Sequence, residues 1–147
     1  MGFWNVLGLG LVGMTVMALP AMAVGSQLTV DVSGLRNQKG QVCVSLFSSG
    51  RGFPDNPNGA VAAQCVRPEG GNAQVTFQNL RGGSYAVAVL HDENSDGKAN
   101  RNALGIPKEG FGFSRNPVLR FGPPKFGEAS FVVAGPTVAT QIQVSYF

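Results

Sequence analysis

Residues 73–91, AQVTFQNLRGGSYAVAVLH, decide the fold class. Apolar and polar side chains alternate through both halves of this stretch, and a glycine pair separates the halves. Alternation with a period of two indicates β-strands with one buried face, whereas an amphipathic helix repeats at about 3.6 residues. The stretch therefore predicts two strands, and the second is expected to place on one face Tyr85, Val87, Val89 and His91.

The same alternation recurs on both sides of this stretch. Further strands are predicted at residues 28–32, 42–46, 59–66, 128–134 and 137–147. Each one-sided apolar face needs a facing sheet to cover it, so we predict an all-β fold, a seven-stranded antiparallel sandwich of two sheets. The core is expected to contain Phe77, Tyr85, Val87, Val89, Val132 and Val144.

The composition agrees with a β-rich domain and excludes several classes of protein. The chain has 147 residues, of which 44% are hydrophobic and 13% are charged. The charged fraction is about half of the roughly 25% typical of globular proteins, which excludes a disordered acidic chain and a charged coiled coil. The net charge of +3 comes from scattered cations without a basic run, so nucleic-acid binding is not predicted.

The N-terminal segment is typical of an export signal. Residues 6–19 are apolar but too short and too glycine-rich to span a membrane, and Ala21-Met22-Ala23 fits the small-residue pattern of a cleavage site. We expect residues 1–23 to be a signal peptide and residues 24–147 to form one domain without a membrane span. A retained membrane anchor is the alternative, because no charged side chain precedes the apolar stretch.

The two cysteines, Cys43 and Cys65, are interpreted in the light of export. In a periplasmic or secreted protein, an even pair of cysteines in a small domain usually forms a disulfide. We therefore predict a disulfide between them, with two buried thiols as the alternative.

Residues 92–127 show no strand or helix pattern. Loops of this length are uncommon in compact domains and are usually functional or disordered. This one contains Phe111, Phe113, Phe121 and Phe126, enough apolar surface to pack onto the sandwich. We predict a long ordered flap.

The start of this segment, DENSDGKAN, resembles the first half of a calcium-binding loop. In such loops oxygen atoms at steps one, three and five wrap the ion, and a glycine permits the sharp turn that follows. Carbonyl and side-chain oxygens at steps seven and nine complete that half. The candidate ligands are Asp92, Asn94, Asp96, the Lys98 carbonyl and Asn100.

The second half of the calcium pattern is missing. The twelfth position is Ala103 where an EF-hand needs a bidentate glutamate, so an EF-hand is excluded. Glu93 or Glu109 is a candidate for the missing carboxylate. The alternative is a metal-free turn, in which Asp and Asn side chains accept hydrogen bonds from nearby backbone N–H groups.

Three ordered motifs resemble a known family. They are FQNLRGGSYAVAVLHDENSDGKAN, then GIPKEGFGFS, then GPPKFGEASF. Together they are similar to the bacterial family catalogued as domain of unknown function 2141, across most of residues 28–146. The first motif is also similar to a strand-turn-strand of transthyretin-like sandwiches, which implies a prealbumin-like or immunoglobulin-like topology. The resemblance implies export and a fold, but no activity. The family has Asp where this chain has Asn100, which removes one negative charge from the calcium loop.

The remaining residues favour binding over catalysis. His91 is the only histidine, and no activated serine motif or unpaired thiol is expected to accompany it. We therefore expect a non-catalytic binding or accessory module of the cell envelope, acting on an unknown envelope component or small ligand. The alternatives are a purely structural envelope domain and a hydrolase that uses the His91 loop. A candidate ligand patch for a peptide, glycan or lipid headgroup consists of Glu109, Phe111, Phe113 and Arg115.

Overall fold

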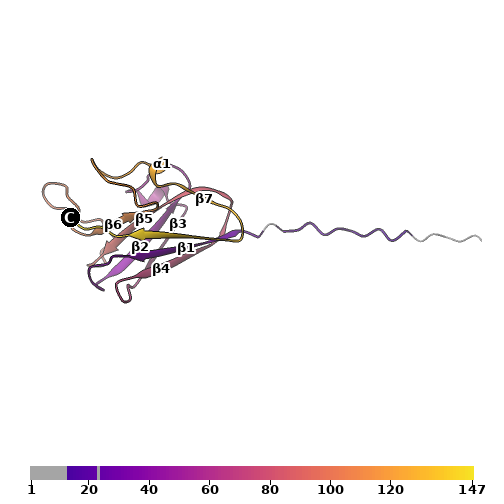
Figure 1. Cartoon of the computed structure of the whole chain (residues 1–147), viewed down its shortest axis with the longest axis horizontal. Helices are drawn as coiled ribbons and strands as arrows, with labels where there is room; N and C mark the ends of the chain where they lie inside the picture. Colours follow the sequence, from indigo (N-terminus) through magenta and orange to yellow (C-terminus); the bar gives the residue numbers. More distant parts are fainter. Residues whose placement is uncertain (1–12, 23) are drawn as a thin grey trace, which may run out of the picture.

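The computed structural model describes residues 13–22 and 24–147, and it shows two packed β-sheets (Figure 1). The smaller sheet has the strand order β4-β1-β8, and the larger has the order β3-β2-β5-β6, with β7 beside β5. The strands are β1 (Ser26–Ser33), β2 (Gln41–Phe47), β3 (Ala62–Val66), β4 (Ala73–Leu80), β5 (Gly83–Asp92), β6 (Gly110–Phe113), β7 (Phe131–Val133) and β8 (Thr137–Gln143). Two single turns of helix accompany them, the 3-10 turn η1 (Pro57–Gly59) and the α-helix α1 (Phe126–Ala129).

The core lies between the two sheets and follows the alternation in the sequence. On β2, Val42, Val44 and Leu46 are fully buried, while the intervening residues face outward and are partly exposed. The predicted core residues are buried, with one exception. Val132 is 67% exposed and its neighbour Val133 is fully buried, so the predicted register of that strand is wrong by one residue.

The described residues form eight strands rather than seven, and these are not all antiparallel. β1 pairs with β4 in antiparallel fashion but with β8 in parallel, from Gln27 opposite Thr137 to Ser33 opposite Gln143. The prediction of a wholly antiparallel sandwich is therefore wrong for this pair. The predicted strand over residues 128–134 is also shorter, because its first two residues belong to α1.

The additional strand is β6, which lies inside residues 92–127, where no strand was predicted. It pairs with β5 from Ala88 opposite Phe113 to His91 opposite Gly110, so this part of the segment belongs to the sheet and is not a flap. A Cβ atom on Gly110 would lie 2.3 Å from the ring of Tyr146, and one on Gly112 would lie 2.7 Å from Ile142. Glycine is therefore needed on the inner side of β6, where the C-terminal segment passes over the strand.

The predicted disulfide is confirmed. Cys43 and Cys65 lie opposite each other on β2 and β3 and are covalently bonded. Residues 1–12 and 23, which make up part of the predicted signal peptide, lie outside the described residues. Residues 13–22 form an extended tail that leaves the sandwich at the end of the domain opposite the C-terminus (Figure 1). In the part of the chain that the structure describes, no helix has the length and apolar character needed to cross a membrane.

Candidate functional site

The Asp/Asn loop, defined as residues 92–100, starts at the end of β5 and is organised around a fully buried carboxylate. Asp92 is 0% exposed, and one of its oxygens accepts hydrogen bonds from the backbone N–H of Gly97 at 2.8 Å and the side-chain amide of Gln41 at 3.0 Å. Its other oxygen accepts the backbone N–H of Asp96 at 3.2 Å. Gly97 has φ +74°, a left-handed conformation that glycine adopts without strain. The local sequence thus forms a tight turn around Asp92.

One side-chain amide and one backbone N–H group hold the Asp96 carboxylate in position. The Asn94 amide donates to one Asp96 oxygen at 3.2 Å, and the backbone N–H of Lys98 donates to the other at 2.9 Å. The Lys98 N–H is the largest cause that lowers the pKa of Asp96, followed by a hydrogen bond from Asn100. Asp96 therefore stays ionised at the surface of the loop.

Glu109, directly before β6, brings a third carboxyl group to the loop. Its side chain accepts a hydrogen bond from the Asn100 amide at 3.2 Å, while its Oε2 atom is buried and has no hydrogen-bond partner among the described residues. Burial, and then the charge of Asp92, raise the pKa of Glu109. This carboxyl group therefore lies in an environment that disfavours its charge.

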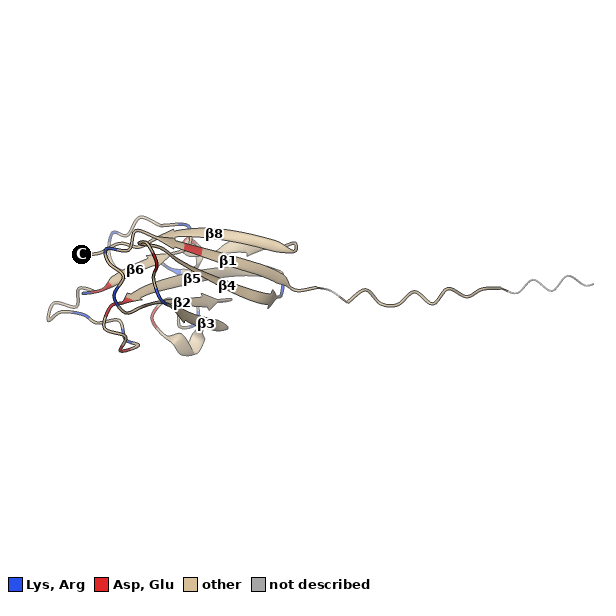
Figure 2. Cartoon of the chain, turned by 90° about the horizontal axis from the view of Figure 1, so that it is seen from below, with Lys and Arg blue, Asp and Glu red and all other residues tan. Residues whose placement is uncertain are grey.

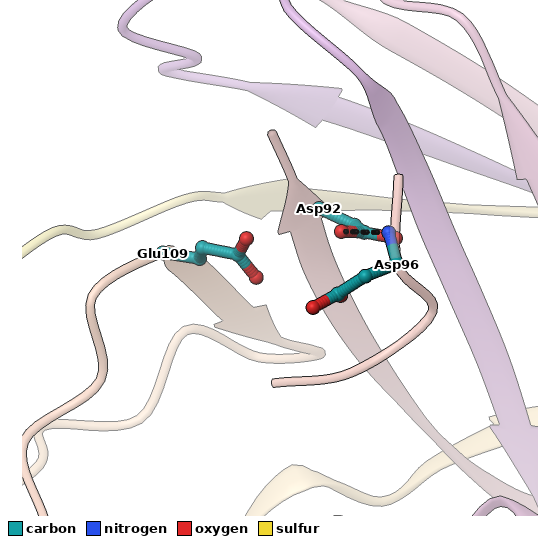
Figure 3. A group of neighbouring side chains, drawn as sticks. All are labelled: Asp92, Asp96 and Glu109. Atoms are coloured by element: carbon teal, nitrogen blue, oxygen red, sulfur yellow. Dashed lines mark hydrogen bonds between the residues drawn. The ribbon is translucent and has the colours of Figure 1, made fainter. Parts of the chain in front are cut away.

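Asp92, Asp96 and Glu109 form a cluster, and one oxygen of each lies within 4.8 Å of the others. Figure 3 shows the three side chains, from the end of β5, the loop and the start of β6, facing a common space. Figure 2 shows that many of the charged positions gather in the loops at this end of the sandwich. Oxygen ligands at such separations suit a hard divalent cation such as calcium.

The structure separates the two glutamates that the sequence offered for this cluster. Glu93 points away and pairs with Arg36, with nitrogen to oxygen distances of 2.6 and 3.1 Å. Glu109 is the one that reaches Asp92 and Asp96. In the sequence, Glu109 is recognisable only as the acidic residue directly before GFGF. The pairing of β6 with β5 is what places its side chain beside Asp92 and Asp96.

His91 is fully buried, and both of its ring nitrogens are engaged. Nδ1 lies 2.6 Å from the Tyr146 hydroxyl and Nε2 lies 2.9 Å from the Lys39 carbonyl oxygen. Since the carbonyl can only accept, Nε2 carries a proton, and in the neutral ring Nδ1 accepts from Tyr146. The imidazole joins the C-terminal segment to the turn before β2.

Three of the four residues of the predicted ligand patch come together. Glu109, Phe111 and Phe113 line a cavity of about 660 Å³, which the loops around β6 form on the outer face of the larger sheet. Arg115 is not part of its lining, and its guanidinium lies 3.5 Å from the Ser130 carbonyl. Sequence reasoning missed most of the other lining residues, which include Ala88, Leu90, Ile106, Leu119 and Arg120.

The fold and the acidic cluster define an all-β domain of two sheets with a candidate cation site between the ends of β5 and β6. Residues 30–141 match the family described as uncharacterized proteins conserved in bacteria, DUF2141, and the chain belongs to this family. No curated protein and no solved structure matches the chain.

Proposed function

We propose that this protein is an exported, non-catalytic binding module of the bacterial cell envelope, and that its Asp/Asn loop holds one calcium ion. The observation that carries the calcium proposal is the buried Oε2 atom of Glu109, which has no partner in the described chain. A buried ionised oxygen without a partner is costly, and a bound cation would remove that cost.

The donor set fits a hard cation. Asp92, Asp96 and Glu109 would supply three carboxylate oxygens, and the Asn100 side chain lies beside Glu109. Calcium takes six to eight oxygen ligands, so this partial set supports weak binding, with a dissociation constant of roughly 10⁻⁴ to 10⁻³ M as in extracellular modules.

The hydrogen bonds within the loop favour one alternative, a metal-free turn in a purely structural domain. Both oxygens of Asp92 already accept N–H groups, from Asp96 and Gly97, so the turn is held without an ion. The two proposals differ at Glu109, because a metal-free turn gives its Oε2 atom no partner.

Export and a non-catalytic role rest on separate observations. A disulfide between Cys43 and Cys65 is typical of proteins outside the reducing cytosol, which supports a periplasmic or secreted location. The only histidine has both ring nitrogens bonded inside the core, which supports a structural role for it rather than general acid-base catalysis.

Calorimetric titration of the purified protein with calcium chloride tests the proposal. We expect a saturable heat for the wild type and at least tenfold weaker binding for Asp96→Asn and for Glu109→Gln. Glu69→Gln is the control, because Glu69 is exposed in the turn before β4 and lies outside the cluster. If the wild type gives no heat, or if all variants bind equally, the loop is a metal-free turn.

A further inference from the structure

The cavity on the outer face of the larger sheet has a floor of small side chains. The floor includes the Cys43–Cys65 disulfide, Ser45, Ala63 and Ala88, which lie on three neighbouring strands. The buried residues between them on β2 and β5 point into the core, so these small residues point away from it. The outer face of the larger sheet is therefore recessed where these small residues lie.

Loop segments on either side of β6 raise the walls of the hollow. Ile106 and Leu119 contribute aliphatic side chains, and Phe111 contributes a ring that packs 5.3 Å from Phe147, another lining residue. The volume of about 660 Å³ lies within the range of small-molecule sites, roughly 300 to 1,000 Å³, and such sites are mostly apolar with a few polar groups.

The charged residues that line the cavity differ in whether another charged side chain lies near them. Of the two acidic lining residues, Asp55 lies 4.0 Å from Arg101, and Glu109 belongs to the acidic cluster. Arg120 is exposed and has no ion pair or side-chain hydrogen bond within the described chain. Arg120 therefore offers a ligand a guanidinium group that no side chain of the described chain pairs with.

Apolar side chains also stand next to the cavity without cover. Leu104 is 84% exposed and Phe121 is fully exposed, and each is a chain neighbour of lining residues, Gly105 in one loop and Arg120 in the other. Exposed apolar surface beside a hollow commonly marks a binding site.

We propose that this cavity binds a single-chain anionic amphiphile, with the apolar chain over the small floor residues and the anionic head at Arg120. The proposal rests on the binding role proposed above but does not require the calcium ion. The apolar walls and floor bury the chain, and the unpaired guanidinium of Arg120 complements a carboxylate or phosphate head.

Titration with cis-parinaric acid, an 18-carbon fatty acid that fluoresces in apolar surroundings, tests the inference. The probe is added to purified protein whose N-terminus has been established by mass spectrometry. We expect saturable binding of one probe per chain. Ala88→Trp, which fills the floor, should weaken binding by about tenfold or more, whereas Ala139→Trp on the outer face of the other sheet should not.

A second arm tests the head group. Arg120→Glu should weaken binding of the acid by about tenfold and leave binding of its uncharged methyl ester within about twofold. Arg81→Glu, in the turn between β4 and β5, is the control. Ile106→Asp, on the exposed wall of the cavity, is a second variant that should also weaken binding. It keeps the test decisive if Ala88→Trp does not fold.

The outcomes separate this inference from the calcium proposal. All titrations are repeated in EGTA, and calcium binding of each variant is measured in parallel. Three results would overturn the amphiphile site: no saturable probe binding, full probe binding by both Ala88→Trp and Ile106→Asp, or a dimer that excludes the probe. None of them bears on calcium binding, which is judged by the heat of the calcium titration. Equal effects of Arg120→Glu on acid and ester overturn the assignment of the head.

Discussion

Glu109 is buried beside Asp92, a second buried carboxylate. In the folded state the pKa of Glu109 is raised, mainly by burial and then by the charge of Asp92. A carboxyl group whose pKa is higher in the folded than in the unfolded state binds more protons when folded. Ionisation of Glu109 therefore destabilises the folded state. The destabilisation is complete at a pH above the folded pKa, and it is absent at a pH below the ordinary value of 4.5.

The first prediction follows from this sign. In EGTA at neutral pH, Glu109→Gln should raise the melting temperature, because the neutral amide carries no charge to bury. In acid, where Glu109 is protonated in both states, the difference should vanish. The measurement is a pair of thermal melts at the two pH values, with Glu69→Gln as the control. A variant that melts below the wild type in EGTA at neutral pH would contradict the prediction.

Sequence reasoning went furthest at the Asp/Asn loop, because its ligand candidates are close neighbours in the chain. Asp92, Asn94 and Asp96 were named from their spacing, and the structure brings all three into one turn. The third carboxylate could not be chosen, since Glu93 and Glu109 were equally plausible. The choice depends on the pairing of His91 with Gly110, a contact that no local pattern in the sequence encodes.

At the scale of the element, strands with strict alternation were predicted with the correct inward face, whereas β6 was missed and β7 was predicted with the wrong face inward. β6 reads GFGF, and its glycines are typical of turns, although close packing of Tyr146 and Ile142 requires them here. β7 reads FVV, and three consecutive apolar residues do not show which face is buried.

The second prediction tests the register of β7. Val133 is fully buried and Val132 is 67% exposed, so the two neighbours form a matched pair. Val133→Ala should lower the free energy of unfolding by about 2 kcal/mol, because it removes buried methyl groups and leaves a cavity. Val132→Ala should change it by less than about 0.5 kcal/mol. Denaturant titrations measure both, and equal losses would mean that the register is wrong.

At the scale of the whole molecule, the disulfide ties together β2 and β3 across a sequence separation of 22 residues. Closing a loop of this length restricts the unfolded chain and is expected to stabilise the fold by roughly 3 kcal/mol. The expectation of export and the even number of cysteines predicted this bond without any knowledge of how the strands pair.

The third prediction joins this bond to export. Intact-mass measurement of protein recovered from the periplasm or medium should give a chain that starts at Val24 and is two hydrogens lighter than the dithiol form. Reduction followed by alkylation provides the control, since both cysteines should react only after reduction. A full-length mass would contradict cleavage, and alkylation without reduction would contradict the disulfide in the exported protein.

The parallel pairing of β1 with β8 has a consequence for the order in which the fold is completed. The Ser26 hydroxyl donates to the Gly135 carbonyl across 109 residues, so β1 lacks one neighbour until nearly all the described chain has been synthesised. Contacts between such distant segments slow folding. A chain that stops before Thr137 leaves one side of β1 with a row of unpaired N–H and C=O groups, a template for strand exchange between incomplete copies.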